Sequence, residues 1–144
     1  MATNPPEPLR LLAADTEDLA VLSAALQDAI GKIGDIRYDA AARSLTLIVN
    51  RFRWEAGGRS SERVRAALQL GGVLSVQARK LRRDAPEALV SMLAVEFQPS
   101  EAPGGWVSLV FAGGGDLRCE VECLDAALAD VSAPWSTPRT PKHD

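Results

Sequence analysis

The residues of this sequence whose types and spacing best predict a binding site are a group of arginines. The run 62–70 alternates polar and apolar residues, and a second alternating run follows Gly71 and Gly72. If the two runs form a hairpin with Leu68 opposite Leu74, Arg63 lies opposite Arg79. Guanidinium groups held side by side repel unless an anion lies between them. We therefore predict a site for an anionic ligand or acidic partner, centred on Arg63 and Arg79; its members are Arg63, Arg65, Arg79, Arg82 and Arg83.

The alternative interpretation of these arginines is an ordinary solvated sheet face, neutralised by nearby carboxylates. Surface charge of this kind is common, and salt screens it. A second candidate surface is an outward-facing Trp106 beside Val110, which would form an apolar patch for a partner. Packing in the core or at a sheet edge is the more usual role of such a tryptophan.

Other chemistry finds little support in the sequence. The single histidine, His143, is next to last, so no catalytic residues of the Ser-His-Asp or Cys-His type are expected. Cys119 and Cys123 would lie roughly 13 Å apart on a strand, too far to share a metal ion or a disulfide. We expect both to be small buried apolar residues, with no metal and no cofactor. The glycines at 113–115 favour a tight turn over a phosphate-binding loop, because a strand and not a helix follows them.

The composition bounds the function. The 144 residues are 47% hydrophobic and carry a net charge of −3, which is ordinary for a globular protein and gives no indication of nucleic-acid binding. No apolar run reaches the ~18 residues of a membrane span, and no signal peptide is recognisable. Two cysteines without a secretion signal predict a cytoplasmic protein. A non-catalytic binding or adaptor module is favoured; a structural homo-oligomer, or an enzyme using Asp and Glu carboxylates in a pocket, are the alternatives.

The elements that would position these residues are mostly strands. Residues 105–111 and 117–122 alternate on both sides of a glycine cluster and predict a hairpin with Phe111 opposite Leu117 and Leu109 opposite Cys119. Apolar residues then fall at helical spacing, which predicts a closing helix; they are Leu124, Ala127, Leu128 and Val131.

Towards the N-terminus the pattern predicts a short strand at 9–12 and an amphipathic helix at 16–29, capped by Asp15 with Asp18 three residues on. A hairpin of 36–39 and 45–54 follows. An inward Phe52 and Trp54 would require a β-bulge near Asn50. The alternative is a strand that is covered on both faces at one end, which Ile48 also permits. One helical turn at 85–88 and a strand at 90–98 complete the list, with 56–61 as a loop.

Together these elements predict an α+β fold: a seven-stranded antiparallel barrel or sandwich, similar to the pleckstrin-homology barrel, with an N-terminal helix and a closing C-terminal helix. One domain would span residues 9–135, between flexible tails at 1–8 and 136–144.

Four segments carry a resemblance to a known family. They are LRLLAADTEDLAVLSAALQDAI, GDIRY, NRFRWE and APGGWVSLVFAGGGDLRCEVECLDAALADV. They resemble a family of small uncharacterised alphaproteobacterial proteins described as a domain of unknown function, and the resemblance extends from Leu9 to about Trp135. It implies a single-domain, cytoplasmic bacterial protein and no assigned activity.

Overall fold

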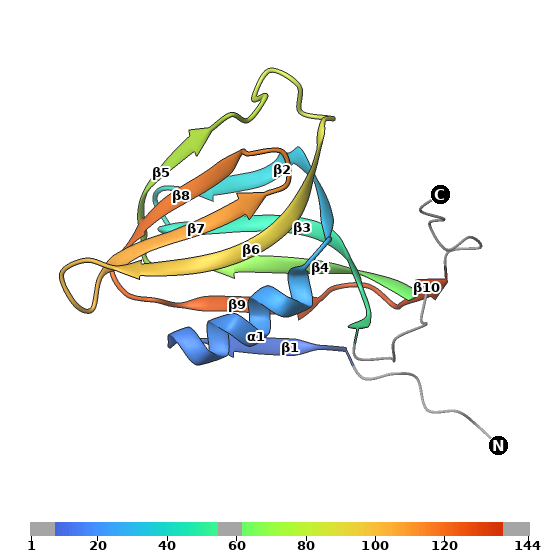
Figure 1. Ribbon diagram of the computed structural model, residues 1–144, viewed down its shortest axis with the longest axis horizontal. Helices are drawn as coiled ribbons and strands as arrows, with labels where there is room; N and C mark the ends of the chain where they lie inside the picture. Colours follow the sequence, from blue (N-terminus) through green and yellow to red (C-terminus); the bar gives the residue numbers. More distant parts are fainter. Residues whose placement is uncertain (1–7, 55–61, 137–144) are drawn as a thin grey trace.

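One open antiparallel sheet makes up most of the protein in a computed structural model, which describes residues 8–54 and 62–136 (Figure 1). The sheet has ten strands in the order β1-β9-β4-β3-β2-β6-β7-β8-β5, and β10 pairs with β4. The elements are β1 (Arg10–Ala13), α1 (Thr16–Leu26), β2 (Ile30–Asp39), β3 (Ser44–Phe52), β4 (Glu62–Leu70), β5 (Val73–Arg79), β6 (Leu89–Pro99), β7 (Gly105–Phe111), β8 (Asp116–Val121), β9 (Ala126–Asp130) and β10 (Trp135–Ser136).

The predicted seven-stranded antiparallel barrel or sandwich, similar to the pleckstrin-homology barrel and with two helices, is wrong. The sheet is open between β1 and β5, and α1 is the one helix of the described residues. The sheet curls so that β6, β7 and β8 lie over β2, β3 and β4 (Figure 1). A single apolar core lies between these two halves and includes Leu47 and Leu109.

The predicted closing helix is a strand, β9, between β1 and β4. Ala126 and Leu128 point into the core, whereas Val131, expected on the same helical face, is 56% exposed. Over so few residues, helical and alternating spacing are both compatible with the sequence. The two neighbouring strands decide the outcome, because they hydrogen-bond a segment of three alanines that has no strong preference for a strand of its own.

The helix begins where its cap predicts. The backbone N–H of Asp18 donates to the carboxylate of Asp15 at 2.8 Å. Leu19, Leu22 and Leu26 are buried, and the helix packs against β6 and β1. It ends at Leu26 and not at 29.

The hairpin of β7 and β8 is present, but its register differs from the prediction by two residues. Leu109 lies opposite Leu117 and Val107 opposite Cys119. The turn between the two strands contains Gly113 and Gly114, whose φ angles of 91° and 97° favour glycine. Because side chains alternate with a period of two, this shift leaves the inward residues inward.

The predicted bulge in β3 is absent, since β3 pairs with β4 continuously from Leu45 to Phe52. Its inward positions are Leu45, Leu47, Val49 and then Arg51, which puts Phe52 on the other face. The irregularity lies instead in β2, between Gly31 and Ile36. Turns take the place of the predicted helical turn at 85–88, and the predicted strand after them is β6.

The predicted hairpin of 62–70 with 74–79 does not form. Strand β4 lies between β3 and β9, whereas β5 lies at the end of the sheet beside β8. Gly72, with φ of 64°, turns the chain out of one half of the sheet and into the other. The predicted loop at 56–61 and most of both predicted tails lie outside the described residues.

Candidate functional site

The structure separates the arginines that the sequence analysis placed together. Arg63 lies opposite Phe52 on β3 and Trp135 on β10, and Arg79 lies opposite Asp116 on β8. Figure 1 shows the β10 end of β4 and strand β5 on different sides of the molecule. The repulsion between Arg63 and Arg79 that motivated the predicted site therefore does not exist.

Arg79 is paired with a carboxylate. Its guanidinium donates to both carboxylate oxygens of Asp116, with Nε at 3.2 Å from each. This hydrogen bond, with a smaller contribution from the charges of Arg79, Arg118 and Lys80, lowers the pKa of the Asp116 carboxyl, although partial burial opposes the shift. The pKa of Arg79 is raised by the same contact.

Arg63 and Arg65 lie on β4, away from the other members of the predicted group. The guanidinium of Arg63 lies over the Phe52 ring, 4.5 Å from its centroid. Its Nε is buried without a hydrogen-bond partner among the described residues. Arg65 is exposed.

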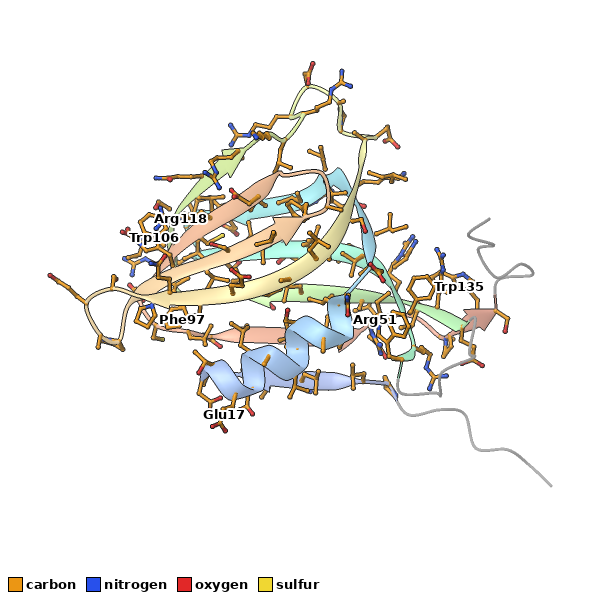
Figure 2. The ribbon with its side chains drawn as sticks, in the orientation of Figure 1. Glu17, Arg51, Phe97, Trp106, Arg118 and Trp135 are labelled. Atoms are coloured by element: carbon orange, nitrogen blue, oxygen red, sulfur yellow. The ribbon has the colours of Figure 1, made fainter. Side chains whose placement is uncertain are left out.

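Trp106 points outward, as predicted, but a cation covers it. The guanidinium of Arg118 lies 4.2 Å from the centroid of the Trp106 ring (Figure 2). Val110 is half-buried and lies opposite Asp116 and Ala94. A partner patch at Trp106 and Val110 stays a prediction.

A cavity of about 240 Å³ lies between β5, the last strand of the sheet, and the second half of β2. Strand β5 pairs on one side with β8, and within the described residues its other edge has no strand partner. At one end of this opening the Tyr38 hydroxyl donates to the Val73 carbonyl at 3.1 Å. The β2–β5 cavity, as we call it, begins beyond this contact; its lining residues are Ile33, Gly34, Ile36, Val76, Ala78, Leu81, Arg83, Pro86 and Leu117.

The lining of the β2–β5 cavity is apolar with one charged residue, Arg83. Ile36, Val76 and Ala78 pack against the core but are only partly buried, whereas the inward residues of the adjacent β8 are fully buried. The core is therefore incompletely covered along this opening.

A second hollow of about 200 Å³ adjoins the first and shares Ile33 and Leu81 with it. Its lining includes Lys80 and Arg82. The connection from β5 to β6 thus places three cations beside two hollows, an arrangement that can hold an apolar group next to an acidic one. Arg82 and Arg83 are the two predicted site residues that line these two hollows.

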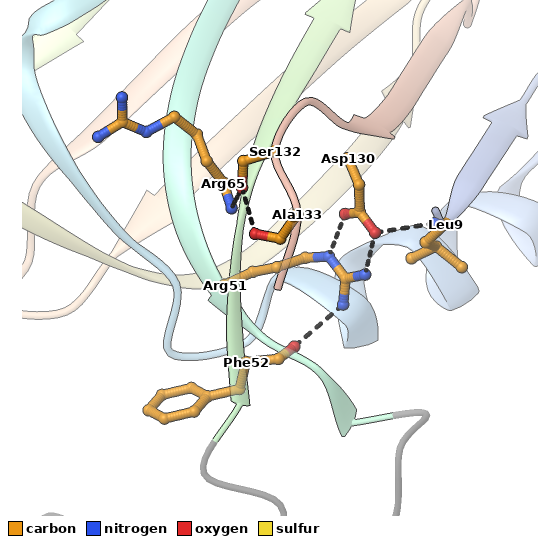
Figure 3. A network of polar contacts seen from close by, with 7 residues as sticks. All are labelled: Leu9, Arg51, Phe52, Arg65, Asp130, Ser132 and Ala133. Carbon is orange, nitrogen blue, oxygen red and sulfur yellow. Dashed lines mark hydrogen bonds and ion pairs between the residues drawn. The ribbon is translucent and has the colours of Figure 1, made fainter. Parts of the chain in front are cut away.

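A buried ion pair that was not predicted from the sequence joins β3 to β9 (Figure 3). The side chain of Arg51 is 0% exposed and that of Asp130 is 3% exposed. Arg51 Nε and Nη2 each lie 2.9 Å from a carboxylate oxygen of Asp130, and Arg51 Nη1 donates to the Phe52 carbonyl at 3.0 Å. The Leu9 N–H donates to the same carboxylate at 2.8 Å. The position of this ion pair between three strands indicates that the pair has a structural role.

The sequence contained a signal for half of this pair. The alternation of Leu45, Leu47 and Val49, continued for one more step, places Arg51 inward. The assumed bulge hid this step, and the assumed helix hid Asp130.

The two cysteines differ in exposure. Cys119 is buried, as predicted, whereas Cys123 is exposed, so the prediction that both are buried is wrong. Cys123 follows the end of β8 and does not continue its inward pattern. Burial raises the pKa of the Cys119 thiol to about 12. Both thiols are free, and within residues 8–54 and 62–136 no cluster of His, Cys, Asp and Glu could hold a metal ion.

We expect native protein to show one fast-reacting thiol. Cys123 is accessible to a thiol reagent, whereas Cys119 is buried, and its raised pKa lowers its fraction of reactive thiolate further. Cys123→Ser should remove the fast phase, and denaturant should expose the slow thiol. Equal labelling rates for the two cysteines in native protein would contradict the burial of Cys119.

The fold and the cavity define an antiparallel β protein with an open sheet and a hollow at its unclosed edge. The chain belongs to the family described as "Protein of unknown function (DUF2948)", whose model matches residues 9–143. This confirms the family resemblance seen in the sequence. No curated protein and no solved structure matches the chain. The described part of the chain contains no helix with the length and apolar character needed to cross a membrane.

Proposed function

We propose that this protein is a non-catalytic binding module whose β2–β5 cavity holds an apolar group beside an acidic one. The observation that carries the proposal is a single arginine, Arg83, in an otherwise apolar lining that leaves core residues partly exposed. An apolar group in the cavity would complete the burial of Val76 and Ala78. A carboxylate or phosphate at its end would form charge-assisted hydrogen bonds with Arg83, and Arg82 and Lys80 add positive charge nearby.

The proposed site includes only some of the arginines of the anion site predicted from the sequence. Arg82 and Arg83 stay in the site. Arg79 is engaged by Asp116, and Arg63 and Arg65 lie on another strand, so these three are left out.

We further propose that the protein works in the cytoplasm and that residues 9–135 form one domain. The exposed free thiol of Cys123 supports a reducing compartment, where such a thiol does not form disulfides.

Sodium octanoate is a suitable probe, because it joins an apolar chain to a carboxylate. We expect it to raise the melting temperature of the wild-type protein, since a ligand that binds the folded state stabilises it. Arg83→Ser should weaken octanoate binding about tenfold, the effect of losing a hydrogen bond to a charged group. Octanol, which lacks the charge, should bind wild type and Arg83→Ser equally.

Arg65→Ser is the matched control, because it removes the same charge from an exposed position outside this cavity. It should respond to octanoate as wild type does. No stabilisation by octanoate, or an equal response in the Arg83→Ser protein, would overturn the proposal.

A further inference from the structure

We propose that the natural occupant of the β2–β5 cavity is an extended peptide segment of another protein, which adds as a strand to the free edge of β5. This inference rests on the proposed function and names the class of partner.

The free edge of β5 is the first observation. At one end of the sheet, β1 has four residues, whereas β5 at the other end has seven, Val73–Arg79. Within the described residues, β5 pairs with β8 alone. Unpaired N–H and C=O groups along an edge strand are a template for another strand, and β5 contains no proline that would block pairing.

The second observation is that β2 faces this edge without pairing to it. Tyr38 of β2 meets Val73 of β5 at one end, while Ile33 and Gly34 line the cavity with Ala78 and Leu81 further along. At the first end the Tyr38 hydroxyl donates to the Val73 carbonyl, and the Val73 N–H donates to the Arg43 carbonyl of the β2–β3 turn at 2.8 Å. The edge of β5 is free beyond Val73, where no backbone hydrogen bond joins β2 and β5 in the described part of the chain. Beyond it the two strands enclose the cavity, which leaves room for further chain beside β5.

The side chains along the opening match the repeat of a strand. Val76 and Ala78 lie opposite the buried Cys119 and Leu117 of β8, so both point to the core side, and both remain partly exposed. An added strand with apolar residues at alternate positions would cover them. At the open end, Lys80, Arg82 and Arg83 would meet an acidic side chain of the added segment.

Two other occupants fit less well. A second copy of β5 would bring no acidic residue to this basic end, because Val73–Arg79 contains neither Asp nor Glu. A small amphiphile would fill the cavity but leave the edge of β5 unpaired.

The test uses full-length protein and a synthetic peptide, acetyl-Glu-Val-Thr-Val-Thr-Val-Glu-amide, which carries an acid at each end and so suits either strand direction. Its control is the same peptide with the central valine replaced by proline, which cannot donate a hydrogen bond. Amide hydrogen exchange of β5 is the main readout. We expect the first peptide to slow exchange in β5 and the proline peptide to bind at least about tenfold more weakly.

Octanoate separates this inference from the proposed function. It should occupy the cavity without slowing exchange along β5. Replacing both glutamates of the peptide with glutamine should weaken binding to wild type and have little effect on binding to Arg83→Ser. If octanoate binds in an Arg83-dependent manner while neither peptide slows β5 exchange, strand addition is overturned and the binding cavity stands. If the proline peptide protects β5 equally, strand addition is also overturned, and if octanoate does not bind at all, both proposals fall.

Discussion

Replacing Asp130 with alanine is expected to lower the free energy of unfolding by about 3–5 kcal/mol. Asp130 gives both carboxylate oxygens to Arg51, whose side chain is fully buried between β3 and β9. A guanidinium in this position has lost its hydration, and the variant removes the carboxylate that compensates for that loss. The Leu9 N–H would lose its acceptor as well. Urea denaturation followed by circular dichroism measures the change.

Two controls make the result specific. Glu87→Ala breaks an exposed ion pair between Glu87 and Lys32. The Glu87 side chain is 82% exposed and that of Lys32 is 50% exposed, so the variant should lower the free energy of unfolding by no more than about 1 kcal/mol. The double variant Arg51→Met with Asp130→Leu should be far less destabilised than Asp130→Ala, because an apolar pair of similar size needs no compensation. A cost below 1 kcal/mol for Asp130→Ala would show that the buried pair does not hold β3 to β9.

Ending the chain after Glu122 is expected to abolish cooperative unfolding. The truncation removes β9, which pairs with β1 on one side and β4 on the other, so β1 would lose its only strand partner among the described residues. It also removes the buried Leu124 and Leu128, each worth about 1.5–3 kcal/mol when fully buried. The loss of Asp130 adds the cost given above. A typical domain is stable by only ~5–15 kcal/mol, so these losses approach the whole.

Thermal unfolding followed by circular dichroism tests this expectation. A chain ending after Pro138 is the control: that cut lies outside the described residues and leaves every element of the sheet in place. It should melt as the full chain does. A cooperative transition in the fragment ending at Glu122 would mean that β9 is dispensable.

The sequence by itself determined the local structure of parts of this protein. The alternation in β7 and β8 and the cap at Asp15 predicted where these elements lie, because strand pleating and helix capping depend on neighbouring residues. The two-residue error in the β7–β8 register left the same side chains inward, since the pleat repeats every two residues.

Only the tertiary structure decided how strands beyond the β2–β3 and β7–β8 hairpins pair. Alternation places Val64 and Val76 on inward faces equally well whether β4 and β5 pair with each other or lie in different halves of the sheet. The segment 126–130 is a strand because it hydrogen-bonds to β1 on one side and β4 on the other. Its own pattern of apolar residues did not predict a strand. The candidate site also depends on the tertiary structure. Arg82 and Arg83 could be named from the sequence, but the apolar cavity beside them exists only because folding brings β2 and β5 together and leaves them unpaired. Such long-range pairings depend on the packing of the whole core, which no short stretch of sequence encodes.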